Sequence, residues 1–234
     1  MAHDGQDLQM KPIVLPDLLA LTGAAIAPRD AALEAARVAV RNQVTQEGRV
    51  SGQLIEANQT AAHGLSWLAT YVYALRQMQD WADKLQSDGG FHEMEQLIHQ
   101  IAFGEYLAQV QGGIQMNQGE ILRLQDLGLG QDAMEALRTE AVVTLTEAGN
   151  TQAARSRLAE LMQEQAGATM FGASGLEEEL EMIRDQFRRY ASDKVEPHAH
   201  DWHLKDELIP MEVIEELAEM GVFGLTIPEE FGGF

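Results

Sequence analysis

The chain closes on the run Leu225-Thr226-Ile227-Pro228-Glu229-Glu230-Phe231-Gly232-Gly233-Phe234. The paired glycines of this run let the backbone turn without the steric penalty that a Cβ would bring. Ahead of the run we predict a short helix that starts with Pro210 in its first position and ends at Gly221, because proline suits the first helical residue and glycine suits the left-handed residue after a helix. Its buried face is expected to hold Val213, Ile214, Leu217 and Met220.

A second amphipathic helix is predicted before that one. Ser174 and Glu177 have the S-x-x-E spacing of a capping box, in which each side chain accepts a hydrogen bond from a backbone N–H of the other residue. The helix should end near Pro197, since proline cannot continue the helical hydrogen bonds. Its apolar face has the alternating spacing of four and three that a buried helical stripe requires, at Leu176, Leu180, Ile183, Phe187 and Tyr190.

The rest of the chain also has helical periodicity, so the sequence predicts an all-α fold. Two long helical segments, 51–87 and 91–127, are separated by Gly89-Gly90, and a turn this short makes the two helices antiparallel neighbours. Gly112-Gly113 is expected to kink the second of these helices, because each glycine costs about 1 kcal/mol relative to alanine inside a helix.

Shorter elements complete the prediction. Pro28-Arg29-Asp30 is expected to start a helix with Asp30 as its N-cap, running to about Gln46. Two further helices are expected at 132–148 and at 150–165, the latter with Asn150 as a candidate N-cap.

Four regions follow from this pattern. We expect residues 1–12 to be a disordered tail and residues 13–166 to form an antiparallel helical bundle. Residues 167–174 are small, uncharged and rich in glycine, which is typical of a linker. Residues 175–234 are expected to form a second, separate helical domain.

The composition limits the possible functions. With no cysteine, the chain can form neither disulfides nor thiolate metal sites nor a cysteine nucleophile, which fits the reducing cytoplasm where we expect it to work. No apolar run reaches the ~18 residues that a transmembrane helix needs. The net charge of −21 repels phosphate backbones and anionic lipids, so we expect neither a nucleic-acid nor a membrane partner.

The acidic charge is denser toward the end of the chain. Residues 172–234 carry 16 acidic and 5 basic side chains, whereas residues 1–171 carry 21 and 11. This change in composition is consistent with two modules, although acids that simply cover solvated helix faces explain most of the charge.

Residues 175–233 resemble the N-terminal helical domain of the acyl-CoA dehydrogenase family along their whole length. The features that carry the resemblance, in order, are Glu177-Glu178-Glu179, Arg184, Phe187-Arg188, Val195-Glu196-Pro197, Trp202, Ile209-Pro210, residues 217–225 and residues 227–233. Their order and spacing make the resemblance more specific than any one of them. The long helical extension is similar to the arrangement in one branch of this family, above all at residues 64–71 and 101–106.

The resemblance implies an FAD-dependent enzyme that oxidises a short branched acyl-CoA to its α,β-unsaturated form. In such enzymes a carboxylate removes the α-proton, and the β-hydride goes to flavin N5. The resemblance also implies a homo-oligomer and an electron-transferring flavoprotein as electron acceptor. The alternative is a non-catalytic helical module that supports assembly.

In this family the catalytic base and most flavin contacts lie in domains that come after the N-terminal one. We therefore expect the chain to be the front portion of a longer enzyme, stopping before the flavin-binding domains and inert alone. No catalytic, cofactor-binding or metal-binding residue is assigned to this sequence, and FAD is not expected to bind this segment by itself.

Two groups of histidines contain residue types that can bind a metal ion. His198, His200 and His203, with Asp201 and Asp206, offer suitable ligands, but a turn between helices is the favoured interpretation. His92 and His99 share a predicted helix face and are expected to be surface or packing residues.

Four other patterns have ordinary explanations. The carboxylates of Glu177–Glu181 suit a helix N-terminus rather than acid–base catalysis. Gly128-Leu129-Gly130 lacks the remaining residues of a phosphate loop. Two sets are expected to pack in the core: the methionines Met78, Met94 and Met116, and the aromatic residues Trp67, Tyr71, Tyr73 and Trp81.

Overall fold

The computed structural model describes residues 12–168 and 170–233. Residues 1–11 lie outside this range, so the disordered tail stays a prediction. The chain divides into two compact units, Met1–Gly175 and Leu176–Phe234. Helices dominate both units, which confirms the all-α prediction.

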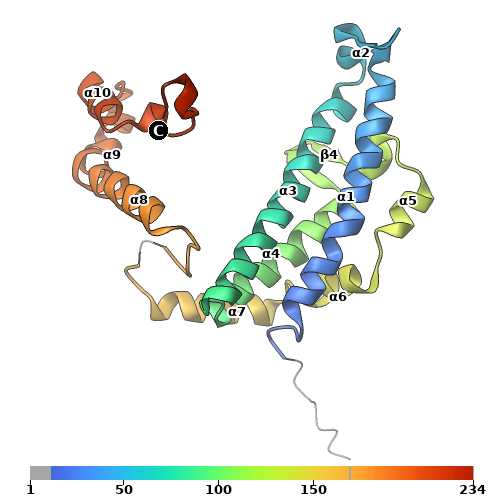
Figure 1. The fold of residues 1–234 in the computed structure, drawn as a ribbon, viewed down its shortest axis with the longest axis horizontal. Helices are drawn as coiled ribbons and strands as arrows, with labels where there is room; N and C mark the ends of the chain where they lie inside the picture. The colour runs from blue at the N-terminus through green and yellow to red at the C-terminus, as the bar shows by residue number, and fades with distance from the viewer. Residues whose placement is uncertain (1–11, 169, 234) are drawn as a thin grey trace, which may run out of the picture. The chain divides into compact units, whose positions relative to one another are not determined.

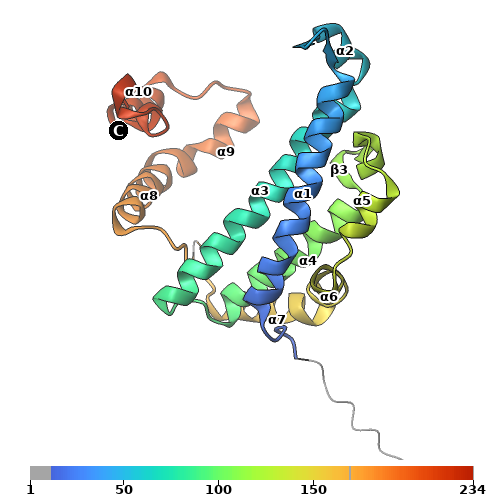
Figure 2. The same ribbon diagram turned by 45° about the vertical axis from the view of Figure 1, so that its right-hand side comes forward.

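In the first unit, α1, α3 and α4 run side by side (Figures 1 and 2). The chain reverses after α3 at Gly89, whose φ of 75° is in the left-handed region that glycine favours, and α4 returns along α3. The helices of this unit are α1 Leu18–Gln43, α2 Gly52–Ala57, α3 Gln59–Asp88, α4 Glu93–Gly112, α5 Gln131–Ala136, α6 Glu140–Ala148 and α7 Gln152–Glu164.

Two small antiparallel hairpins interrupt the helices. Strands β1 Thr45–Gln46 and β2 Arg49–Val50 pair after α1, and β3 Ile114–Asn117 and β4 Glu120–Leu122 pair after α4. A 3₁₀ turn at Leu124–Leu127 follows β4. The sequence pattern predicted α-helix at residues 45–46, 114–117, 120–122 and 124–127, and the structure shows that this prediction was wrong.

The predicted helix start at Asp30 is also wrong, because α1 continues through Pro28. A proline inside a helix costs about 3 kcal/mol. The helix nevertheless keeps one buried stripe on both sides of the proline, at Leu18, Thr22, Ala25, Arg29, Ala32, Ala36 and Val40. Asp30 does not cap a helix but accepts a hydrogen bond from Arg76 Nε at 2.9 Å.

Gly112-Gly113 ends α4 instead of kinking it. Gly113 has a φ of 135°, which only glycine adopts readily, and the residues after it alternate between buried and exposed as a strand requires. Buried Ile114 and Met116 thereby turn inward while Gln115 and Asn117 face out.

The single helix predicted at 132–148 is divided into α5 and α6. Thr139 caps α6 by accepting a hydrogen bond from the backbone N–H of Val142 at 3.4 Å. At α7 the cap is Thr151, one residue after the predicted Asn150.

The first unit has two buried apolar clusters. One lies around α1, α3 and the β3–β4 hairpin, with Leu68, Val72, Leu122 and Leu127 at its centre. The other joins α1, α3, α4 and α6 through Leu75, Phe103, Leu107 and Leu145.

The second unit consists of α8 Glu178–Tyr190, a π-helical turn Ala191–Val195, α9 Glu196–Lys205, α10 Met211–Glu219 and 3₁₀ turns at Val222–Gly224 and Glu229–Phe231. The N-cap of α8 is Glu177, so the helix does not start at Ser174 as the capping box predicted. Pro197 stands in the first turn of α9, where its missing N–H is tolerated, and not at the end of a helix. Gly221 ends α10 with a φ of 82°, as predicted.

The second unit has no buried core. None of the described residues between 176 and 233 is buried. The predicted burial of the α10 stripe is only partial, and Ile214 remains 36% exposed. The helices are held together by a few contacts, among them a hydrogen bond of 3.2 Å from the Tyr190 hydroxyl to the Val213 carbonyl.

Candidate functional site

The histidine-rich segment of the second unit is helical. His198, His200 and His203 lie on α9, so the predicted turn is wrong. Within residues 12–168 and 170–233, no three His, Asp or Glu side chains are placed to hold a metal ion. His198 instead lies beside Trp202, with the ring centres 5.8 Å apart.

His92 and His99 have different environments. His92 is exposed just before α4, whereas His99 is fully buried with its Nε2 3.0 Å from the Thr22 hydroxyl. Burial lowers the pKa of His99 to about 4, against a smaller opposing effect of the Met78 backbone. A neutral, buried imidazole of this kind supports packing between α1 and α4.

Arg29 is the one residue of the α1 stripe with a charged side chain, and it is only 1% exposed. Its Nη1 donates a hydrogen bond of 2.9 Å to the Leu137 carbonyl, which fixes the connection between α5 and α6. Burial lowers the pKa of its guanidinium to about 10. The sequence pattern did not single out Arg29 as a functional residue.

Two of the aromatic side chains on α3, Tyr71 and Trp81, pack against α4. The rings of Tyr71 and Tyr106 stack with their centres 4.7 Å apart, and the Tyr71 hydroxyl donates to Gln109. Burial raises the pKa of Tyr71. Tyr73 differs from the others, because it is 55% exposed with the Arg76 guanidinium over its ring.

The remaining candidate patterns have structural roles. Met94 and Met116 are buried, and Met78 packs against the core. Gly128 is the left-handed residue after the 3₁₀ turn. Glu178, Glu179 and Glu181 lie in the first turn of α8, where the helix dipole favours negative charge.

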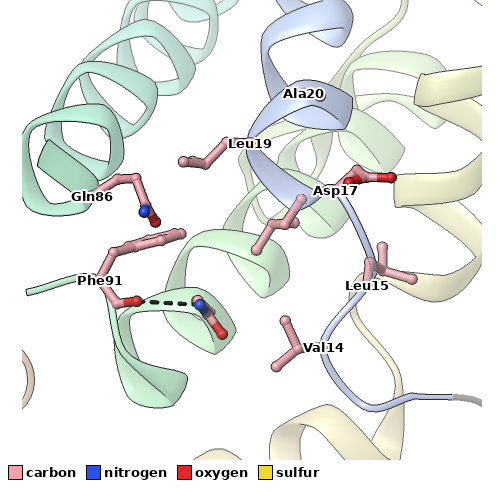
Figure 3. A pocket seen from close by; sticks show the side chains of 9 residues that line it. Val14, Leu15, Asp17, Leu19, Ala20, Gln86 and Phe91 are labelled. Atoms are coloured by element: carbon pink, nitrogen blue, oxygen red, sulfur yellow. Dashed lines mark hydrogen bonds between the residues drawn. The ribbon is translucent and has the colours of Figure 1, made fainter. Parts of the chain in front are cut away.

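One cavity lies where the chain enters α1. It has a volume of about 360 Å³, and Figure 3 shows Gln86 and Phe91 on one side and Leu15 and Asp17 on the other. Its lining is largely apolar, and Asp17 is its single ionisable group. This cavity suits an apolar group and contains no pair of residues for acid–base or nucleophilic catalysis.

A second, larger groove of about 530 Å³ lies between α4 and α7. Its walls are apolar, with Ile101, Leu158 and Met162 among them, and Glu105 and Arg155 stand in its lining as well. The Glu105 carboxylate accepts a hydrogen bond of 2.7 Å from the Asn150 side chain and so has a partner within the protein.

The most unusual surface belongs to the second unit. Large apolar side chains remain exposed on α8, α9, α10 and both 3₁₀ turns, and in the segments between them, with Leu208 at 92% and Phe231 at 74%. We call this set the apolar face of the second unit: Leu176, Leu180, Met182, Leu204, Leu208, Ile209, Met211, Ile214, Phe223, Leu225, Ile227 and Phe231. A surface of this kind marks a place where other protein normally packs.

Comparison with known proteins finds relatives that are similar over a quarter of this chain and one that is similar over nearly all of it. Residues 177–234 match the family described as acyl-CoA dehydrogenase, N-terminal domain. Glutaryl-CoA dehydrogenase of Desulfococcus multivorans is 34% identical to this chain, and a probable acyl-CoA dehydrogenase of Bacillus subtilis (strain 168) is 33% identical. Each similarity covers 58 residues, which are 25% of this chain and 15% of the relative.

The similarity to one relative extends through the helical extension. The chain is 60% identical to (2S)-methylsuccinyl-CoA dehydrogenase of Cereibacter sphaeroides over 223 residues, which cover 94% of this chain. The chain spans 40% of the length of that relative. No helix within the described residues is long and apolar enough to cross a membrane. By these similarities residues 177–234 match the N-terminal domain of the acyl-CoA dehydrogenase family, and most of the chain is similar to 40% of the length of one named acyl-CoA dehydrogenase.

Proposed function

We propose that this chain is the N-terminal part of an FAD-dependent acyl-CoA dehydrogenase that oxidises methylsuccinyl-CoA to mesaconyl-CoA. The observation that carries the proposal is the 60% identity to (2S)-methylsuccinyl-CoA dehydrogenase, which continues through the extension as well as the family domain. The similarity to each of the two other relatives covers 58 residues, a quarter of this chain. The extension therefore favours the first relative's substrate over glutaryl-CoA.

The second unit supports the proposal from its own energetics. A unit with no buried residue gains little free energy from the hydrophobic effect, which contributes about 25 cal/mol per Å² of apolar surface buried. Its apolar face needs a partner surface to become stable. We propose that the later domains of the same enzyme supply this partner, and that the N-terminal helices then help to shape the active site.

We expect the described residues not to bind FAD by themselves. Residues 176–233 bury no polar side chain that could hold an isoalloxazine, and the two cavities described above lie in the first unit with largely apolar linings. We therefore assign no chemical step to these residues. In the proposed enzyme their contribution is to form a scaffold and to exclude water beside the reacting thioester.

Two partners belong to the same proposal. We expect an electron-transferring flavoprotein to accept the electrons, and we expect the enzyme to form a homo-oligomer in the cytoplasm. The apolar face supports a role in assembly, whether its partner surface lies in the same subunit or in another one.

Substrate-dependent bleaching of flavin absorbance tests the proposed function. The complete protein, purified with its flavin and kept without oxygen, should lose its yellow absorbance when methylsuccinyl-CoA is added. Glutaryl-CoA is the matched control and should leave the absorbance unchanged. A protein without flavin, or one bleached by glutaryl-CoA alone, would contradict the proposal.

A further inference from the structure

Residues 172–175 lie just before the second unit, and we name them the strap. Their sequence is Gly172-Ala173-Ser174-Gly175, which the composition pattern assigned mostly to a linker. Both backbone polar groups of Ala173 are bound by side chains of the helical bundle. Its N–H donates to Glu95 Oε1 at 2.8 Å, and its carbonyl accepts from Trp81 Nε1 at 3.1 Å.

The two side chains that hold the strap come from neighbouring helices. Trp81 is on α3 and Glu95 is on α4, on either side of the short turn between them. Glu95 is only 6% exposed, although a carboxylate normally stays in water. Its second oxygen accepts the His92 backbone N–H at 3.2 Å and so caps α4. One buried carboxylate therefore serves the helix and the strap together.

The glycines of the strap fit the same two side chains. Gly172 has a φ of 78°, and a Cβ there would lie 3.2 Å from Glu95 Oε1. Gly175 has a φ of 71°, and a Cβ there would lie 3.0 Å from Trp81 Cδ1. Each glycine is needed for its left-handed backbone and for its close approach to one of the holding side chains. A free linker has no such requirement at either position.

We propose that the strap is a fixed attachment to the bundle, and that Glu95 and Trp81 are the residues that position it. Only Leu176 and Glu177 then separate the attached strap from the start of α8. The second unit is thus joined to the first through a short connection that leaves the bundle at a set point, instead of through a long flexible tether. This inference does not depend on the identity of the substrate or on flavin.

Amide hydrogen exchange of the 234-residue chain tests the attachment. Peptides that cover the strap should exchange at least ~10-fold more slowly than a free chain, because the Ala173 N–H is bonded to a buried carboxylate. Glu95→Gln leaves one neutral acceptor oxygen for the two N–H groups of Ala173 and His92, so it should weaken this protection and also increase exchange at the start of α4. Trp81→Phe should speed exchange at the strap while leaving the cap of α4 intact, since Trp81 does not contact His92 N–H.

Glu93→Gln is the matched control. Glu93 lies in the same first turn of α4 and carries the same charge, but it pairs with Arg157 at 2.8 Å and not with the strap. In Glu93→Gln the strap amides should exchange at the same rate as in the wild type. Far-UV circular dichroism of each variant establishes that the bundle is folded. Exchange of the strap at the free-chain rate in the wild type, or unchanged exchange in both Glu95→Gln and Trp81→Phe, would overturn the proposal.

A distance measurement in the 234-residue chain tests the consequence. Because this chain has no cysteine, spin labels can be placed through Ser87→Cys on α3 and Ser192→Cys in the second unit. Glu95→Gln should broaden the distribution of label distances, and Glu93→Gln should not. An equal width in all three proteins would show that the strap does not restrict the connection, whatever the outcome of the flavin experiment.

Discussion

The side-chain amide of Gln100 donates a hydrogen bond to the Gly149 carbonyl oxygen, 3.0 Å away. The same Nε2 donates to the Ile13 carbonyl at 3.0 Å, and its Oε1 accepts the Leu15 backbone N–H at 2.7 Å. Gln100 is fully buried on α4. A single side chain therefore connects the entry to α1, the middle of α4 and the turn between α6 and α7.

Replacing Gln100 with leucine should destabilise the first unit strongly. The substitution leaves three backbone groups without their partner, and an unsatisfied buried group costs about 1–3 kcal/mol, so we expect a loss of roughly 3–5 kcal/mol in the free energy of unfolding. Urea titration measures this loss. Gln111→Leu, at an exposed position of the same helix, should change the free energy by less than about 0.5 kcal/mol. Equal effects at the two positions would refute the connecting role of Gln100.

Alanine substitutions at Gly104 and at Gly112, both on α4, should change the free energy of unfolding in opposite directions. A Cβ at Gly104 would lie 2.8 Å from the Asn150 backbone nitrogen, whereas a Cβ at Gly112 would meet nothing within 4 Å. Gly104→Ala should therefore reduce the free energy of unfolding by about 1–3 kcal/mol. Gly112→Ala should raise it by up to about 1 kcal/mol through helix propensity. Thermal unfolding of the two variants checks both signs.

The stability of the first unit should fall in mild acid because of His99. The pKa of this residue is about 4 in the folded chain, against an ordinary value of 6.5. Between these two pH values the unfolded chain binds the extra proton, so stability decreases as the pH falls, with a slope near 1.4 kcal/mol per pH unit and a total of roughly 3 kcal/mol.

His99→Gln should remove this part of the pH dependence. The exposed His63 provides the control, since His63→Gln should leave the slope unchanged. The measurement is the free energy of unfolding in urea at several pH values from 4 to 7. If the free energy of unfolding of His99→Gln depends on pH as steeply as that of the wild type, other groups cause the pH dependence.

Leu208 should matter to the complete enzyme and not to this chain alone. The side chain is 92% exposed, so Leu208→Ser should change the melting temperature of the 234-residue chain very little. In the complete protein the same substitution should lower stability by about 1–3 kcal/mol, as expected when a buried leucine becomes polar. Calorimetry of both proteins makes the comparison, and an equal effect in the two would show that nothing covers this part of the apolar face.

Periodicity predicted the helices that carry one continuous apolar stripe. Spacing predicted a helix at 51–87, which the structure divides at Asn58 into α2 and α3, and the short Gly89-Gly90 turn predicted the return of α4 along α3. Pro28 misled the prediction, because the buried stripe on both sides of it offsets the local cost of the proline. The hairpin after Gly113 was missed because its strands are short and lie next to a long helical pattern.

The candidate functional surfaces were harder to predict. Amphipathic spacing indicated that Ile214 has an apolar side to bury, but spacing does not say whether the burying partner lies in the same unit. The roles of Glu95 and Gln100 depend on residues 78 and 85 positions away, respectively, and no local pattern contains them. Side chains that bond to distant backbone groups become visible only in three dimensions.

The lack of any buried residue among the described residues 176–233 has a consequence for biosynthesis. The first unit encloses two apolar clusters, so it can fold while the ribosome is still making the second unit. The helices of the second unit then emerge with leucines and phenylalanines open to water, and they are the part of the nascent polypeptide that we expect chaperones to bind.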